Sequence, residues 1–140
     1  MYMATIEASV IINAPADKVW DLVSDIDNEA KFWKGTKSIR NISKDGNVIT
    51  REVTIAFKDS KCMQTVVLYP KEKIIGEFTD GILIGTKTIQ LSPQENQTKL
   101  EAIWDIKLSG MMGMFTGMIK KHVKSGTEQA LQSIKQEVEK

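Results

Sequence analysis

The sequence predicts an α+β domain in which a curved antiparallel sheet of seven strands wraps around one long C-terminal helix. Residues 36–108 alternate like consecutive strands separated by short turns, which favours antiparallel neighbours. Residues 114–140 carry apolar side chains at three- and four-residue intervals, the spacing of one helical face. About 25 residues of helix span roughly 37 Å. The apolar side of so long a helix needs a partner surface, which the strands supply.

The N-terminal part predicts one strand followed by two short helices. Apolar and polar residues alternate over residues 5–12, as in a half-buried strand. Asn13 is expected to cap a short helix over residues 16–24, with Pro15 near its first helical position. A second short helix or ordered turn is expected over residues 30–35, where it ends at a glycine.

Six further strands are expected after these helices. Asp45-Gly46 is the signal of a tight hairpin, and Asp80-Gly81 marks another turn. A longer turn, containing Pro93, is predicted between the last two strands. The predicted strands cover residues 36–43, 48–57, 62–69, 74–79, 82–91 and 98–108.

The long helix is predicted to turn one uneven face toward the sheet. The first half of that face is made of Met, Phe, His and Gly, and the second half is small and aliphatic. We therefore expect the helix to pack at one end and to leave a hollow at the other, where an apolar molecule would bind. The residues of this face are Phe115, Met118, Ile119, His122, Val123, Gly126, Ala130 and Ile134.

Composition limits the classes of function. A chain of 140 residues fits one domain, 1–140, and buries roughly two-thirds of its unfolded surface. The net charge of +1 gives no overall field that would steer the protein to nucleic acid or to an anionic membrane. Cys62 is the only cysteine, which agrees with a reducing compartment. Without a secretory signal or an apolar run of ~18 residues, we expect a cytoplasmic protein with at most transient membrane contact.

Several motifs resemble the START-like superfamily (Bet v 1-like, SRPBCC), which has the helix-grip fold and includes polyketide cyclase/dehydrase-like and coenzyme Q-binding START proteins. They are residues 13–25 with an apolar-Pro-x-x-x-Val-Trp start, the pair Phe32-Trp33, the strand start at 81–85, and Gly110 before the last helix. The resemblance covers essentially the whole chain. It implies a deep cavity for a hydrophobic ligand between the sheet and the last helix. It implies no catalytic residue, because the superfamily hosts carriers, cyclases, hydrolases and protein-binding members.

Three polar residues are candidate ligand anchors. Arg51 shares the face that its strand should bury, so its guanidinium needs a partner. That partner is a ligand carboxylate or phosphate, or a protein acid such as Glu77 or Asp105; otherwise the side chain reaches water at the open end. Gln64 falls on the inward face of the next strand. His122, the only histidine, is an anchor, a general acid/base, or a partly buried side chain bonded to backbone.

Apolar residues complete the expected site. Trp104 faces inward from the last strand, as a cavity wall or as plain core. Thr86 and Thr88 are also expected to face inward. Residues 110–118 hold four of the seven methionines and three glycines, which suits a pliable gate, a loosely packed helix start, or a tip that touches a membrane or a protein. The expected ligand-binding residues are Arg51, Gln64, Trp104, Phe115, Met118 and His122.

These observations favour binding or transport of a small hydrophobic ligand, such as a lipid, a quinone or a polyketide-like molecule. The second hypothesis is a polyketide cyclase/dehydratase-type enzyme in which His122 or Arg51 polarises a carbonyl or moves a proton; it ranks lower because neither has a second acid/base partner. The third is a protein-interaction module. No phosphate loop, dinucleotide fingerprint or set of zinc ligands occurs in the sequence, so we expect no cofactor and no metal.

Overall fold

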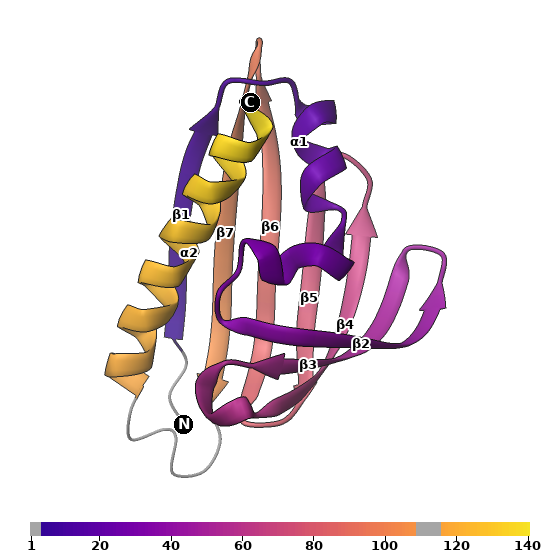
Figure 1. Cartoon of the computed structure of the whole chain (residues 1–140), viewed down its shortest axis with the longest axis vertical. Coiled ribbons are helices and arrows are strands. Elements are labelled where there is room, and N and C mark those ends of the chain that lie inside the picture. Colours follow the sequence, from indigo (N-terminus) through magenta and orange to yellow (C-terminus); the bar gives the residue numbers. More distant parts are fainter. Residues whose placement is uncertain (1–3, 109–115) are drawn as a thin grey trace.

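A seven-stranded antiparallel sheet curls around one long helix in the computed structural model of the chain (Figure 1). The structure describes residues 4–108 and 116–140. This arrangement confirms the predicted helix-grip fold. The elements are β1 (Ala4–Ile12), α1 (Ala16–Val23), the short 3-10 helix η1 (Ile26–Lys31), β2 (Thr36–Asp45), β3 (Val48–Ile55), the short 3-10 helix η2 (Phe57–Asp59), β4 (Lys61–Tyr69), β5 (Lys73–Asp80), β6 (Leu83–Gln94), β7 (Gln97–Leu108) and α2 (Thr116–Val138).

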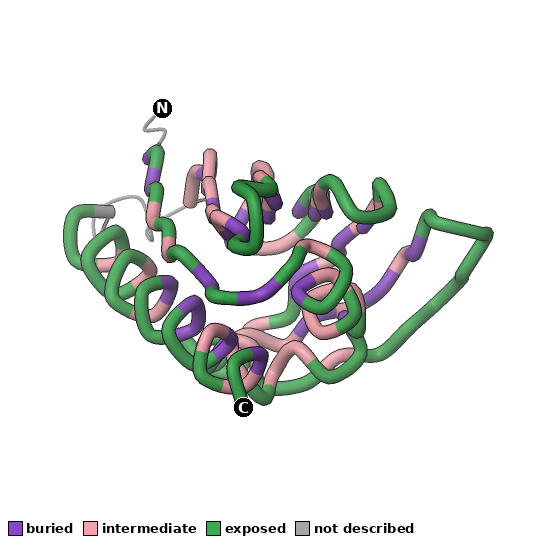
Figure 2. The backbone as a smooth tube through the Cα atoms, turned by 90° about the horizontal axis from the view of Figure 1, so that it is seen from above, coloured by how far each residue is buried: buried purple, intermediate pink, exposed green. Residues whose placement is uncertain are grey.

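The strand order is β1-β7-β6-β5-β4-β3-β2, so the first strand lies beside the last one. Along this pair Ala4 stands opposite Ile106 and Ile12 opposite Thr98. The other neighbours follow each other in sequence, as short connections favour. Helix α2 runs along the β1 margin of the sheet, and the β2–β3 hairpin projects at the other margin (Figures 1 and 2).

Two predicted segments differ most from the structure. The short helix expected over residues 30–35 lies earlier, as η1. The long turn expected around Pro93 is instead a continuation of both strands, with Pro93 opposite Thr98 and a tight turn in which Glu95 has φ 54°. Pairing between β5 and β6 ends at Gln90, so Pro93 lies where β6 has only one neighbour. A proline without an N–H is tolerated at such a local edge.

The inward face of β6 differs from the prediction by one residue. Leu83, Lys87 and Ile89 are buried, whereas Thr86 and Thr88 are only half-buried and belong to the opposite face. In a strand every second side chain points the same way, so a shift of one residue exchanges the two faces. The consequence is that a lysine, rather than two threonines, enters the interior.

Buried apolar side chains form two clusters on the sheet face that the helices cover. The upper cluster joins α1, the C-terminal half of α2 and the sheet, and includes Val19, Leu100 and Leu131. We call the second one the lower cluster; it consists of Ala4, Ile6, Cys62, Phe78, Leu83 and Ile106. Trp104 packs against both clusters. Burial alternates along the strands, as on β3 and β4.

Helix α2 packs through its second half. Its buried side chains are Thr127, Ala130, Leu131, Ile134 and Val138, and its described side chains before Thr127 are exposed or half-buried. This agrees with the expectation that the helix packs at one end. Neither α1 nor α2, as far as the structure describes them, is long and apolar enough to cross a membrane.

Candidate functional site

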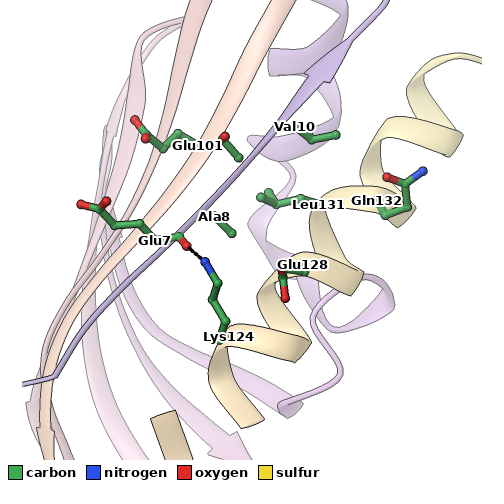
Figure 3. A pocket seen from close by; sticks show the side chains of 9 residues that line it. Glu7, Ala8, Val10, Glu101, Lys124, Glu128, Leu131 and Gln132 are labelled. Atoms are coloured by element: carbon green, nitrogen blue, oxygen red, sulfur yellow. Dashed lines mark hydrogen bonds between the residues drawn. The ribbon is translucent and has the colours of Figure 1, made fainter. Parts of the chain in front are cut away.

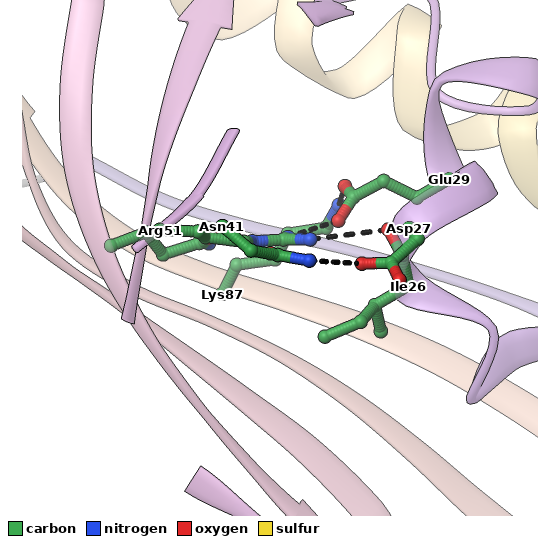
Figure 4. Close-up of polar contacts among 7 residues, drawn as sticks. Ile26, Asp27, Glu29, Asn41, Arg51 and Lys87 are labelled. Atoms are coloured by element: carbon green, nitrogen blue, oxygen red, sulfur yellow. Dashed lines mark hydrogen bonds and ion pairs between the residues drawn. The ribbon is translucent and has the colours of Figure 1, made fainter. Parts of the chain in front are cut away.

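A buried group of polar side chains lies between η1 and the sheet (Figure 4). We call Glu29, Arg51, Gln64 and Lys87 the polar centre; they come from η1, β3, β4 and β6. Arg51 is 2% exposed, Gln64 4% and Lys87 8%, and the side chain of Glu29 is 15% exposed. Charges removed from water this far must be compensated by partners.

Arg51 connects η1 to the sheet. Burial alternates along β3 so that Arg51 points inward with its neighbours Ile49 and Val53. Its Nε donates a hydrogen bond to Gln64 Oε1 at 2.8 Å, and its Nη1 donates to the carbonyl oxygen of Ile26 at 3.1 Å. Its Nη2 donates to Glu29 Oε1 and forms an ion pair with it. The guanidinium is therefore held on three sides by described residues.

The partner of Arg51 differs from both acids proposed from the sequence. Glu77 is exposed on β5, and Asp105 accepts a hydrogen bond from Thr5 Oγ1 at 2.8 Å on the other side of the sheet. Glu29 takes their place because η1 folds across the strands. Arg51 does not reach open water, so the alternative that its side chain extends to solvent is also wrong.

A second polar contact attaches η1 beside the first. Asn41 stands opposite Arg51 in the β2–β3 register, and its Nδ2 donates to Asp27 Oδ1 at 2.9 Å (Figure 4). Adjacent residues on two strands thus hold adjacent parts of η1. This short helix is positioned by the sheet, since only Ile26 among its residues is itself buried.

Lys87 is the member of the polar centre with the weakest polar contact. Its Nζ lies 3.8 Å from Glu29 Oε2, and 3.2 Å and 4.9 Å from the ring centroids of Trp33 and Trp104. Aromatic faces attract an ammonium that lies within about 6 Å of the ring centroid, as both indoles do here. Burial lowers the pKa of Lys87 from 10.5 to about 8; the carboxylate of Glu29 opposes this shift and the charge of Arg51 adds to it. An amine with such a pKa exchanges protons near neutral pH.

Aromatic rings form a wall beside Lys87. Trp104 stacks on Phe78 with ring centroids 6.3 Å apart, and meets Trp33 edge-on at 6.2 Å. Its Nε1 donates to Thr127 Oγ1 on α2 at 3.0 Å. The wall therefore joins the polar centre, the lower cluster and the helix.

A glycine makes room for the side chain of Gln64. A Cβ atom at Gly76 on β5 would lie 2.5 Å from Gln64 Nε2. Gly76 pairs with Lys87 in the β5–β6 register, while Gln64 pairs with Phe78. The amide of Gln64 therefore lies across β5, on the side where Lys87 stands.

Three of the six expected site residues come together: Arg51, Gln64 and Trp104. The orientation predicted for the other two described residues is wrong, because Met118 is 55% exposed and His122 is exposed on α2. Phe115 lies outside the described residues, as do positions 110–114 of the methionine-rich segment. The buried face of α2 consists of Thr127 and the aliphatic residues that follow it. Its centre is rotated about the helix axis from the predicted face by roughly the angle between successive residues, about 100°.

Sequence reasoning missed Glu29 and Lys87 as site residues. For Lys87 a signal was present. It lies two and four residues before Ile89 and Leu91, so it points to the same face of the strand, and both of these residues are buried. For Glu29 no periodic signal exists, because η1 is short and its apolar residues follow no pattern.

Concavities lined by described residues include one large groove and one small pocket. The larger, about 450 Å³, is an open groove between β1 and α2 with largely polar walls, away from the polar centre (Figure 3). The smaller is an apolar pocket of about 10 Å³ under the start of α2. Its volume corresponds to about one water molecule. It is lined by Ala4, Ile6, Ile106, Lys107, Leu108, Ile119 and Lys120.

The fold is that of a START-like protein of the helix-grip class. Residues 3–139 match the family described as "Polyketide cyclase / dehydrase and lipid transport", and the chain belongs to this family. No curated protein matches the chain at the level of sequence.

Solved structures with the same fold share few residues with this chain. TTHA0849 from Thermus thermophilus has a TM-score of 0.83 and 14% identity, covering 96% of this chain and 97% of its own. The Zhui aromatase/cyclase from Streptomyces sp. R1128 has a TM-score of 0.80 and 17% identity, covering 99% and 94%. Ara h 8.0201 has a TM-score of 0.73 and 16% identity, covering 98% of both chains. At these identities the likeness concerns the fold.

Proposed function

We propose that the chain, as a single domain spanning residues 1–140, binds or transports a small hydrophobic molecule between the sheet and the N-terminal half of α2. Candidates are a lipid, a quinone or a polyketide-like compound. The observation that carries the proposal is the position of the polar centre at the border of the lower cluster: Trp104 lies beside Lys87 and stacks on Phe78 of that cluster. Binding sites for such molecules are mostly apolar with a few placed polar groups.

The energetic gain on binding suits this surface. Burying apolar area contributes ~25 cal/mol per Å², so a ligand that buries about 300 Å² gains about 7 kcal/mol before the entropic costs of binding. The lower cluster supplies aliphatic and aromatic side chains for such contact, among them Ile6, Phe78 and Ile106.

Ligand entry would require movement of the helix start, because the apolar pocket beneath it holds only about 10 Å³. The packing of α2 supports this route. Residues 117–126 contribute no buried side chain, whereas the residues from Thr127 onward fix the helix to the sheet. The first half of α2 can therefore shift at a smaller cost than the second half.

We further propose a cytoplasmic location with transient membrane contact during ligand exchange. Cys62 is a free thiol, as is usual in a reducing compartment. The exposed Met118 lies next to Lys120 and Lys121, a pairing of apolar and basic residues that suits the surface of an anionic membrane.

Native mass spectrometry of freshly purified protein, followed by organic extraction, tests for a co-purified ligand. Displacement of the neutral dye N-phenyl-1-naphthylamine gives a second measure. Val123 packs against the lower cluster, so Val123→Trp should fill the binding space and abolish dye binding. His122→Trp, one residue away on the exposed side, is the matched control and should bind normally. Equal dye binding by both variants, or none by the parent protein, would contradict the proposal.

A second candidate function is catalysis of the cyclase/dehydratase kind. It is favoured by Lys87, whose pKa of about 8 and proximity to Glu29 suit proton transfer near neutral pH. These two residues supply the acid/base pair that His122 and Arg51 do not. Turnover of a poly-β-ketone analogue, followed by absorbance of the aromatic product, should depend on one group titrating near pH 8. Unchanged turnover by Lys87→Met would exclude this mechanism.

A further inference from the structure

The ammonium of Lys87 donates no hydrogen bond of ordinary length to any residue within 4–108 or 116–140. Its nearest acid oxygen, Glu29 Oε2, is 3.8 Å from Nζ, beyond hydrogen-bonding distance. Two indole rings occupy other sides of the group. A side chain that is only 8% exposed therefore keeps donors without an acceptor.

The amide nitrogen of Gln64 is a second buried donor that lacks a protein acceptor. Arginine can only donate, so Arg51 Nε fixes Oε1 of Gln64 toward itself and turns Nε2 toward Gly76. Nε2 has no acceptor in the described part of the chain. Among the described side chains, no nitrogen or oxygen is both fully shielded from solvent and without a partner. Both donors therefore border accessible space.

The charges of the polar centre do not balance. Arg51 and Lys87 are positive, whereas Glu29 is the one carboxylate paired with them in the described structure. Glu29 is already engaged by Arg51 Nη2, and its ion pair with Lys87 has the longer distance. An unbalanced charge in a poorly hydrated place is costly, and an added anion relieves that cost.

We propose that Lys87 Nζ and Gln64 Nε2 together bind the carboxylate of an apolar acid. The tail of the acid would lie along Phe78 and Trp104 toward the lower cluster. This inference rests on the proposed function and specifies the class of its ligand. Arg51 acts as a positioning residue, because it orients the amide of Gln64.

The proposal includes a pH dependence. The charged groups that face Lys87 are Glu29 from η1 and Arg51 from β3; Gln64, Trp33 and Trp104 are neutral. A bound carboxylate stabilises the protonated amine. Because the pKa of Lys87 is about 8 without ligand, the affinity for an acid should fall above about pH 8, by up to about tenfold per pH unit. The affinity for a neutral analogue should not change.

Two matched ligand pairs test this preference. Decanoate is compared with 1-decanol, and 2-naphthoate with 2-naphthamide, by displacement of a neutral dye at pH 7. In at least one pair we expect the acid to bind about tenfold more tightly than its neutral analogue, or better. This ratio corresponds to the free energy of a hydrogen bond to a charged group. Lys87→Met should remove the preference while neutral ligands still bind. Lys99→Met, which removes a charge from the outer face of β7, is the control and should keep it.

A second variant keeps the test decisive if Lys87→Met folds poorly. Gln64→Glu retains an acceptor for Arg51 and supplies its own carboxylate beside Lys87, so it should exclude acids and still bind neutral ligands. In protein with ¹³C-labelled lysine, decanoate should raise the pKa of Lys87, and decanol should not. Equal affinity for acid and neutral analogue in both pairs, without a response of Lys87, would overturn this inference and leave the proposed function standing. Failure of every ligand to bind would overturn both.

Discussion

The indole N–H of Trp104 on β7 donates to the hydroxyl of Thr127 on α2 at 3.0 Å, and this bond marks the point where the helix becomes buried. Toward the C-terminus α2 packs on the sheet; toward its start the described side chains are exposed or half-buried. Trp104 also contacts Phe78 and the ammonium of Lys87. One residue thus connects the first buried position of the helix to the polar centre.

Thr127→Val should destabilise the protein by about 1–2 kcal/mol, because Trp104 Nε1 loses its acceptor in a partly buried place. The threonine hydroxyl also donates to the carbonyl oxygen of Val123 at 2.6 Å. Chemical denaturation measures the cost, and the indole N–H resonance of Trp104 should shift. Ser133→Ala, at an exposed position of α2, should change stability by less than about 0.5 kcal/mol.

Glu29→Ala should lower the free energy of unfolding by about 3–5 kcal/mol, because it leaves two buried cations without their carboxylate. The matched control is Glu52→Ala, whose partners Arg40 and Lys61 are both 67% exposed. That change should cost less than about 1 kcal/mol. Similar losses of unfolding free energy in the two variants would show that the buried pair does not fasten η1.

The lowered pKa of Lys87 predicts that stability rises with pH. Between about 8 and 10.5 the unfolded chain holds more protons than the folded one at this residue, so the free energy of unfolding increases across that window. The gain from this residue is roughly 3 kcal/mol. Guanidinium denaturation of the parent and of Lys87→Met at several pH values isolates it. The free energy of unfolding of the parent minus that of Lys87→Met should increase above pH 8, and a value independent of pH would contradict a buried charged lysine.

Lysines of α2 protect the free edge of β1. Lys124 Nζ donates to the carbonyl oxygen of Glu7 across the groove in Figure 3, and Lys135 Nζ donates to that of Ile11 at 2.8 Å. An exposed strand edge is a template for pairing with another chain. Replacing both lysines by methionine should therefore promote self-association, measured by sedimentation velocity.

The control for this edge variant replaces Lys120 and Lys121, which are exposed on the same helix. It removes the same charge and should leave the sedimentation profile of the parent protein unchanged. Association of the control as well would assign the effect to charge rather than to the strand edge.

Local signals explain why the fold was predictable. Alternation placed the strands, Asp45-Gly46 placed the β2–β3 hairpin, and Pro15 immediately preceded α1. Each signal acts over a few residues and needs no knowledge of the rest of the chain. The alternation of inward and outward positions along a strand also predicted correctly that Arg51 and Gln64 point inward.

The site was less predictable because its contacts are not local. Glu29 lies 22 residues from Arg51 on a segment without periodicity. At the start of β6 the run Ile82–Ile84 is apolar at every position, so the sequence does not show which alternate residues face inward. The prediction chose the wrong set and placed Lys87 on the outer face. On α2 a change of one residue rotates the face by about 100°, enough to move His122 from the sheet to solvent.

The position of β1 has a consequence for synthesis on the ribosome. Its one hydrogen-bonded strand neighbour in the sheet is β7, and a contact such as Thr5 with Asp105 joins residues 100 positions apart. Of the seven strands β1 is synthesised first and its partner β7 last. Strand β1 therefore remains unpaired until the other strands have been made, and α2, which shields its edge, is made later still. Chaperones that hold nascent chains would meet this segment unpaired throughout that interval.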